Sequence, residues 1–172
     1  MAMINMKPSD KVSKFFSYGE LWRSEGAIRL GINNEPTPEH LENLIWYANN
    51  IGDPCRMFAG GPLHISFYRS EALNNATPGS AKPSFHMLGM AGDIDCQHYG
   101  HGHNGLLFEW IVKNLTFAQA IWEFGNNVEP DWIHVTAFPE SKKMVGGLRW
   151  NEKKLTRAIK ENGKTIYKPF DL

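Results

Sequence analysis

The stretch PSFHMLGMAGDID, residues 83–95, places two possible metal ligands close together among unusually small residues. His86 lies seven positions before Asp93, and two glycines and an alanine are among the residues between them. Such small residues add little to a hydrophobic core, whereas they let the backbone turn tightly or let another group approach it. We therefore interpret this stretch as a compact segment that brings an imidazole and a carboxylate together and lets a substrate approach them.

A third candidate ligand lies in DWIHVTAF, residues 131–138, whose β-branched and aromatic residues predict a strand. Alternation along a strand would place Trp132 and His134 on the same face. A catalytic zinc ion usually has three protein ligands of nitrogen or oxygen type and one position left for water. His86, Asp93 and His134 therefore form a candidate zinc-binding set.

Length and composition predict a single domain that spans residues 1–172. The 172 residues are 42% hydrophobic, which suffices for one sizeable core but not for two ordinary domains. Eighteen basic residues balance eighteen acidic ones, so the overall charge does not indicate a nucleic-acid partner. Residues 140–172 carry nine Lys and Arg against four Asp and Glu. A solvated basic face is the ordinary explanation, and contact with an anionic surface such as a cell wall is the alternative.

No apolar run has the length of a signal peptide or of a membrane span, so we expect synthesis in the cytoplasm and no membrane insertion. The two cysteines, Cys55 and Cys96, lack a metal-type spacing and are too few for a disulfide scaffold. We expect both to be reduced thiols.

Local patterns predict helices early in the chain. Ser17 and Glu20 form a capping-box pattern for a first helix that would end near Gly31. Thr37 and Pro38 are typical of the N-cap and first position of a second helix.

Strands are expected to be scattered along the chain. The expected elements are a half-buried strand over 63–69, a helix over 105–115, a mixed segment over 117–125, and a hairpin turning at Asn162-Gly163, with a helix over 151–161 as the alternative. Because these strands do not alternate regularly with helices, the pattern indicates an α+β fold with an antiparallel sheet rather than a doubly wound parallel sheet.

The two ligand-bearing segments together resemble a known signature. The pattern is Ser84-x-His86-x-x-Gly89-x-Ala91-x-Asp93, followed about forty residues later by Trp132-x-His134. It closely resembles that of the zinc D-Ala-D-Ala carboxypeptidase family, peptidoglycan metallopeptidases that share a fold with the Hedgehog signalling domain. The resemblance covers about residues 15–138 and includes SFYRS at 66–70, where Phe67 replaces a common glycine.

The resemblance implies a Hedgehog/DD-peptidase-like α+β fold, in which helices flank an antiparallel sheet that carries the zinc cleft. It also implies a role for each matched residue. His86, Asp93 and His134 would be the ligands of one Zn²⁺ per chain, and Asp131 would be the general base. Arg69 would bind or polarise the substrate, and Ser84 and Trp132 would be further substrate contacts.

The implied function is hydrolysis of a peptide bond that involves a D-amino acid in the peptidoglycan stem peptide, by carboxypeptidase or endopeptidase action. Without a recognisable signal peptide, the chain fits a monomeric bacteriophage endolysin or virion component that reaches the cell wall after lysis release or with the virion. Two alternatives are a catalytically inactive wall-binding or structural virion module on the same fold, and a metal-dependent hydrolase with an unrelated substrate.

Other histidines are weaker candidates. QHYGHGHNG, residues 97–105, contains His98, His101 and His103, which we interpret as part of a glycine-rich surface loop beside the cleft, with contact to the metal as the alternative. His40 and His64 are expected to be structural or exposed to solvent.

Overall fold

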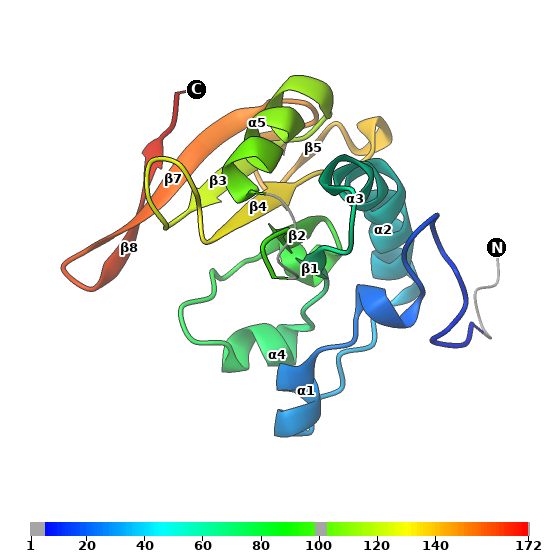
Figure 1. Cartoon of the computed structure of the whole chain (residues 1–172). Coiled ribbons are helices and arrows are strands. Elements are labelled where there is room, and N and C mark those ends of the chain that lie inside the picture. Colours follow the sequence, from blue (N-terminus) through cyan, green and yellow to red (C-terminus); the bar gives the residue numbers. More distant parts are fainter. Residues whose placement is uncertain (1–5, 99–102, 172) are drawn as a thin grey trace.

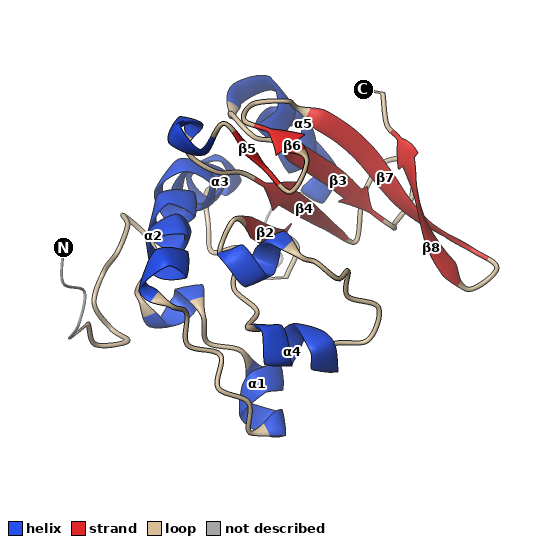
Figure 2. Cartoon of the chain, turned by 180° about the vertical axis from the view of Figure 1, so that it is seen from behind, coloured by secondary structure: helices blue, strands red, loops and turns tan. Residues whose placement is uncertain are grey.

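The computed structural model describes residues 6–98 and 103–171 and shows one six-stranded sheet with helices packed against it (Figure 1, Figure 2). The order of the strands is β1-β2-β4-β3-β7-β8, and all neighbours are antiparallel except β3 and β7. The strands are β1 (His64–Ser66), β2 (Ala91–Asp95), β3 (Gln119–Glu123), β4 (Trp132–Thr136), β7 (Lys154–Glu161) and β8 (Lys164–Pro169). This arrangement confirms the α+β class with a mostly antiparallel sheet.

The remaining elements are short. The α-helices are α1 (Glu25–Leu30), α2 (Pro38–Tyr47), α3 (Asp53–Ala59), α4 (Glu71–Ala76) and α5 (Asn104–Asn114). The other helical turns are η1 (Gly19–Leu21), η2 (Ala48–Gly52), η3 (Phe85–Leu88) and η4 (Glu140–Lys142), and a separate ribbon pairs β5 (Met144–Val145) with β6 (Leu148–Arg149). Among the described residues, no helix is both long and apolar enough to cross a membrane.

The hydrophobic core lies between the sheet and the helices α2, α3 and α5, which cover one face (Figure 1, Figure 2). Ile94 and Ile133 are fully buried, as are Phe108 on α5 and Tyr47 on α2. The Tyr47 hydroxyl donates to the carbonyl of Val135 on β4 at 2.9 Å. Since neighbouring residues of a strand point to opposite faces, these buried positions direct Asp93 and His134 to the face away from the helices.

The predicted second helix and the predicted hairpin are both confirmed. Thr37 caps α2, its side chain accepting a hydrogen bond from the backbone N–H of His40, and Pro38 is the first helical residue. Asn162 and Gly163 connect β7 to β8 with positive φ angles of 50° and 76°, so the hairpin forms and the alternative helix over 151–161 does not.

The first helix differs from its prediction. The chain forms only the turn η1 after Ser17, whose hydroxyl binds the Glu20 carboxylate, and a separate helix α1 begins after Ser24. The break lies where the side-chain amide of Asn34 donates to the carbonyl of Trp22 at 2.5 Å. The predicted helix is therefore divided into a turn and a short helix, and the end at Gly31 is as predicted.

Two strands also differ in detail from their predictions. The segment predicted as mixed, residues 117–125, contains the strand β3, and the strand predicted over 63–69 is limited to β1. β3 pairs in parallel with β7, a contact between distant parts of the chain that no local pattern indicates.

Candidate metal centre

The three predicted ligands converge on one face of the sheet. Asp93 on β2 is directly opposite His134 on β4, and His86 comes from η3. His134 Nδ1 lies 2.8 Å from Asp93 Oδ1, His86 Nε2 lies 3.2 Å from the same oxygen, and the two nitrogens are 3.3 Å apart. The three residues offer one ligand atom each within a space that could hold a metal ion.

The outer nitrogens of both imidazoles have their own partners. His86 Nδ1 lies 2.6 Å from the carbonyl oxygen of Phe67, and because a carbonyl can only accept, this nitrogen must carry the proton. Neutral His86 therefore presents an unprotonated Nε2 to Asp93. His134 Nε2 lies 3.1 Å from the hydroxyl of Thr136, which orients Nδ1 toward the same point. Hydrogen bonds of this kind commonly orient metal-binding histidines.

Electrostatics favour the protonation states that bind metal. Burial lowers the pKa of His86, and the charge of Asp93 only partly offsets this effect. For Asp93, burial alone would raise the pKa, but the imidazoles of His86 and His134 outweigh burial and hold the pKa well below its usual range. A neutral imidazole and an ionised carboxylate are the forms that a metal ion requires.

The group lies in a cavity of about 680 Å³ that also contains three of the predicted substrate contacts. Arg69, Ser84 and Trp132 line it, and Arg69 Nη2 is 3.8 Å from Asp93 Oδ2. Lys160, Thr165 and Tyr167 of the β7–β8 hairpin also line it, so the basic C-terminal segment takes part in the cavity. Sequence reasoning left the role of that segment open.

The cavity does not include the predicted general base. Asp131 is exposed and is not among the residues that line the cavity. Glu123 at the end of β3 lines it instead and is only 7% exposed, and burial raises the pKa of its carboxyl to about 7. The sequence analysis did not identify Glu123. The available signal was strand alternation within residues 119–123, which places Glu123 on the same face as Ile121, the residue paired with His134.

The small residues of the opening stretch serve helix packing. A Cβ at Gly89, whose φ is 69°, would lie 2.5 Å from the carbonyl oxygen of His40 on α2. A Cβ at Gly92 would lie 3.0 Å from both the Tyr47 hydroxyl and Ile65. Our interpretation that these residues leave room for a substrate is therefore wrong for the two glycines, since the space beside them is filled by the protein's own core.

The other histidines that the structure describes lie outside the converging group. His40 Nδ1 is 3.0 Å from the Tyr68 hydroxyl, and the rings of His64 and His98 lie 4.8 Å apart. His103 Nδ1 is 3.1 Å from the Glu129 carboxylate, whereas His101 lies outside the described residues. For the described part of the chain, His86 and His134 are the histidines that meet a carboxylate in a metal-binding arrangement.

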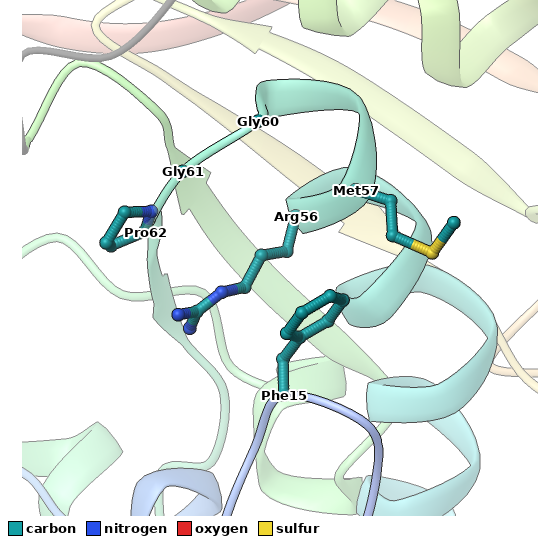
Figure 3. Close-up of a pocket in the computed structure, with 6 residues that line it drawn as sticks. All are labelled: Phe15, Arg56, Met57, Gly60, Gly61 and Pro62. Carbon is teal, nitrogen blue, oxygen red and sulfur yellow. The ribbon is translucent and has the colours of Figure 1, made fainter.

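A second hollow, of about 410 Å³, lies beside α3 (Figure 3). Phe15, Met57 and Pro62 line it together with Arg56, whose guanidinium lies over the Phe15 ring with 5.1 Å to the centroid. No carboxylate, histidine or cysteine belongs to its lining among the described residues. We therefore assign the candidate site to the larger cavity.

Comparisons with known proteins give no relative for this chain: no family model, no curated protein and no solved structure matches it.

Proposed function

We propose that this chain is a zinc-dependent peptidase that cleaves peptidoglycan stem peptides at a bond involving a D-amino acid, in phage-mediated degradation of the cell wall. The observation that carries the proposal is the convergence of His86, Asp93 and His134 in the lining of one cavity. The class of substrate rests on the resemblance of the two ligand-bearing motifs to the zinc D-Ala-D-Ala carboxypeptidase family, and so does the Hedgehog/DD-peptidase-like fold.

The donor set suits zinc. Two imidazole nitrogens and one carboxylate oxygen are a common set for a catalytic zinc site, which leaves a fourth position for water or substrate. Tetrahedral bonds of about 2.1 Å require donor atoms that lie roughly 3.4 Å apart. The three separations of 2.8, 3.2 and 3.3 Å are close to that value. When bound, zinc would polarise the scissile carbonyl and lower the pKa of water to about 7.

The chain's own cations would orient the substrate. Arg69 points into the cavity with 19% of its side chain exposed, and its buried Nε has no hydrogen-bond partner among the described residues. A guanidinium in that position can bind the carboxylate of a stem peptide or stabilise the oxyanion that develops on the scissile carbonyl. Lys160 provides a second positive charge on the hairpin wall. This pair of cations favours a substrate that carries a carboxylate.

Mass spectrometry of the fragments that the zinc-loaded protein releases from purified peptidoglycan tests the proposal. We expect release by the wild type, and none by His134→Ala or by the chelated protein. The new termini would identify the bond and distinguish a carboxypeptidase from an endopeptidase. Zinc binding without any release by the wild type would contradict the proposal and favour the alternative of an inactive wall-binding module.

A further inference from the structure

Glu123 lies on the same face of the sheet as the metal-binding group. It pairs with Trp132 across β3 and β4, and two residues earlier on the same face Ile121 pairs with His134. Paired residues of adjacent strands point to the same side, so Glu123 and His134 are diagonal neighbours. A side chain as long as glutamate can reach across such a diagonal. The carboxyl of Glu123 is thus directed into the cavity next to the ligands.

The carboxyl of Glu123 has the surroundings of a reactive group rather than of a structural one. It is buried at the cavity wall, and none of the ion pairs formed by the described residues includes it. A buried carboxylate is costly unless it is paired, and groups of this kind are concentrated at functional sites. Lys160 also lines the cavity, where its ammonium donates to the Thr165 hydroxyl and lies over the Phe124 ring.

Asp131, the general base implied by the resemblance, is placed differently from Glu123. It stands in a bend immediately before β4, its side chain is exposed, and it does not line the cavity. Its backbone N–H donates to the carbonyl of Glu123 at 2.9 Å, so the two residues are neighbours across the strands. Glu123 is nevertheless buried in the cavity lining, whereas Asp131 is exposed outside it.

We propose that Glu123, and not Asp131, is the general base of the reaction in this chain, an assignment that rests on the proposed peptide hydrolysis. Glu123 takes a proton from the attacking water as the water oxygen bonds to the scissile carbonyl carbon. It then gives that proton to the amide nitrogen as the carbon–nitrogen bond breaks. The products are one new carboxylate and one new amine, and the Glu123 carboxylate is regenerated. A base must lie within hydrogen-bond reach of its water, a condition that only a group inside the cavity can meet.

The test compares Glu123→Gln with Asp131→Asn in the zinc-loaded full chain, with Glu109→Gln on the exposed surface of α5 as the control. Initial rates of fragment release from purified peptidoglycan are measured for each variant. The zinc dissociation constant of each variant is obtained separately by chelator competition. Calorimetry measures the affinity for a synthetic stem peptide. Circular dichroism checks that each variant is folded. We expect Glu123→Gln to lose about 10²- to 10⁴-fold in rate. Its fold, zinc affinity and peptide affinity should stay near those of the wild type.

The remaining variants separate the proposals. Asp131→Asn should lose less than about tenfold, Glu109→Gln should match the wild type, and Glu123→Asp should recover part of the rate because it restores a carboxylate. Loss of activity in Asp131→Asn together with an active Glu123→Gln would overturn the assignment while the proposed function stands. Loss of zinc binding in Glu123→Gln would also overturn it, since the residue would then support the metal site. If the wild type itself releases nothing, both proposals fail.

Discussion

Asp93 and His134 face each other across β2 and β4, with 2.8 Å between Oδ1 and Nδ1, although 41 positions separate them in the chain. The pairing is set by strand register and not by a loop, so the two donor atoms are held by backbone hydrogen bonds on both sides. His86 is held just as firmly from η3 through the carbonyl of Phe67. A site supported in this way needs little rearrangement to accept an ion.

The first prediction concerns the shared oxygen of the group. Asp93→Asn should weaken zinc binding by more than about 100-fold, because it removes the charged donor that both imidazoles face. Asp95→Asn is the matched control: it lies two residues further along β2, where its carboxylate accepts from the backbone N–H of Gln97. Equilibrium dialysis followed by elemental analysis would measure the bound zinc. Equal loss in both variants would argue against the assigned ligand.

A second prediction tests how His134 is oriented. Thr136→Val removes the hydroxyl next to His134 Nε2 with little change in volume, and we expect zinc affinity to fall about tenfold or more. Thr156→Val provides the control because the buried Thr156 hydroxyl has no hydrogen-bond partner among the described residues. Chelator competition would give both affinities. An unchanged affinity in Thr136→Val would show that the hydroxyl does not orient the ring.

Sequence reasoning succeeded where a short segment determines its own structure. Thr37 and Pro38 start a helix, and Asn162-Gly163 forms a tight turn, whatever the rest of the chain does. The proximity of His86, Asp93 and His134 was likewise anticipated, since the spacing and the motif carried that information.

Reasoning from the sequence was less successful where distant segments decide the structure. The predicted first helix is interrupted where the amide of Asn34 binds the carbonyl of Trp22. The parallel pairing of β3 with β7 depends on contacts that no local pattern contains. Asp131 illustrates a further limit: it is only three positions before His134, yet it lies in a bend outside β4 and its exposed side chain does not line the cavity.

The third prediction concerns Gly89, three residues after the candidate ligand His86. Gly89→Ala should destabilise the fold by roughly 3 kcal/mol, because a positive φ strains alanine and its Cβ would collide with the His40 carbonyl on α2. Gly31→Ala is the control, with a similar φ of 64° and no atom within 4 Å of the added Cβ. It should cost only about 1 kcal/mol. Urea unfolding would measure both, and equal losses would contradict the proposed role of helix packing.

The fourth prediction follows from the environment of Glu123 in the metal-free protein. Burial raises its pKa from 4.5 to about 7, so between these values the folded state holds a proton that the unfolded state has released. The contribution of Glu123 to stability therefore declines as pH rises from about 4.5 to 7, by up to roughly 3 kcal/mol. Glu123→Gln removes this ionisation without removing the side chain.

The metal-free Glu123→Gln variant should therefore be more stable than the wild type at pH 8, by up to about 3 kcal/mol, and similar to it near pH 4.5. Urea unfolding at several pH values would measure the difference, with Glu109→Gln expected to follow the wild type. Parallel pH curves for the wild type and Glu123→Gln would contradict the prediction. If Glu123→Gln gains stability at pH 8 and loses peptidase activity, Glu123 lowers the free energy of unfolding but is needed for the reaction.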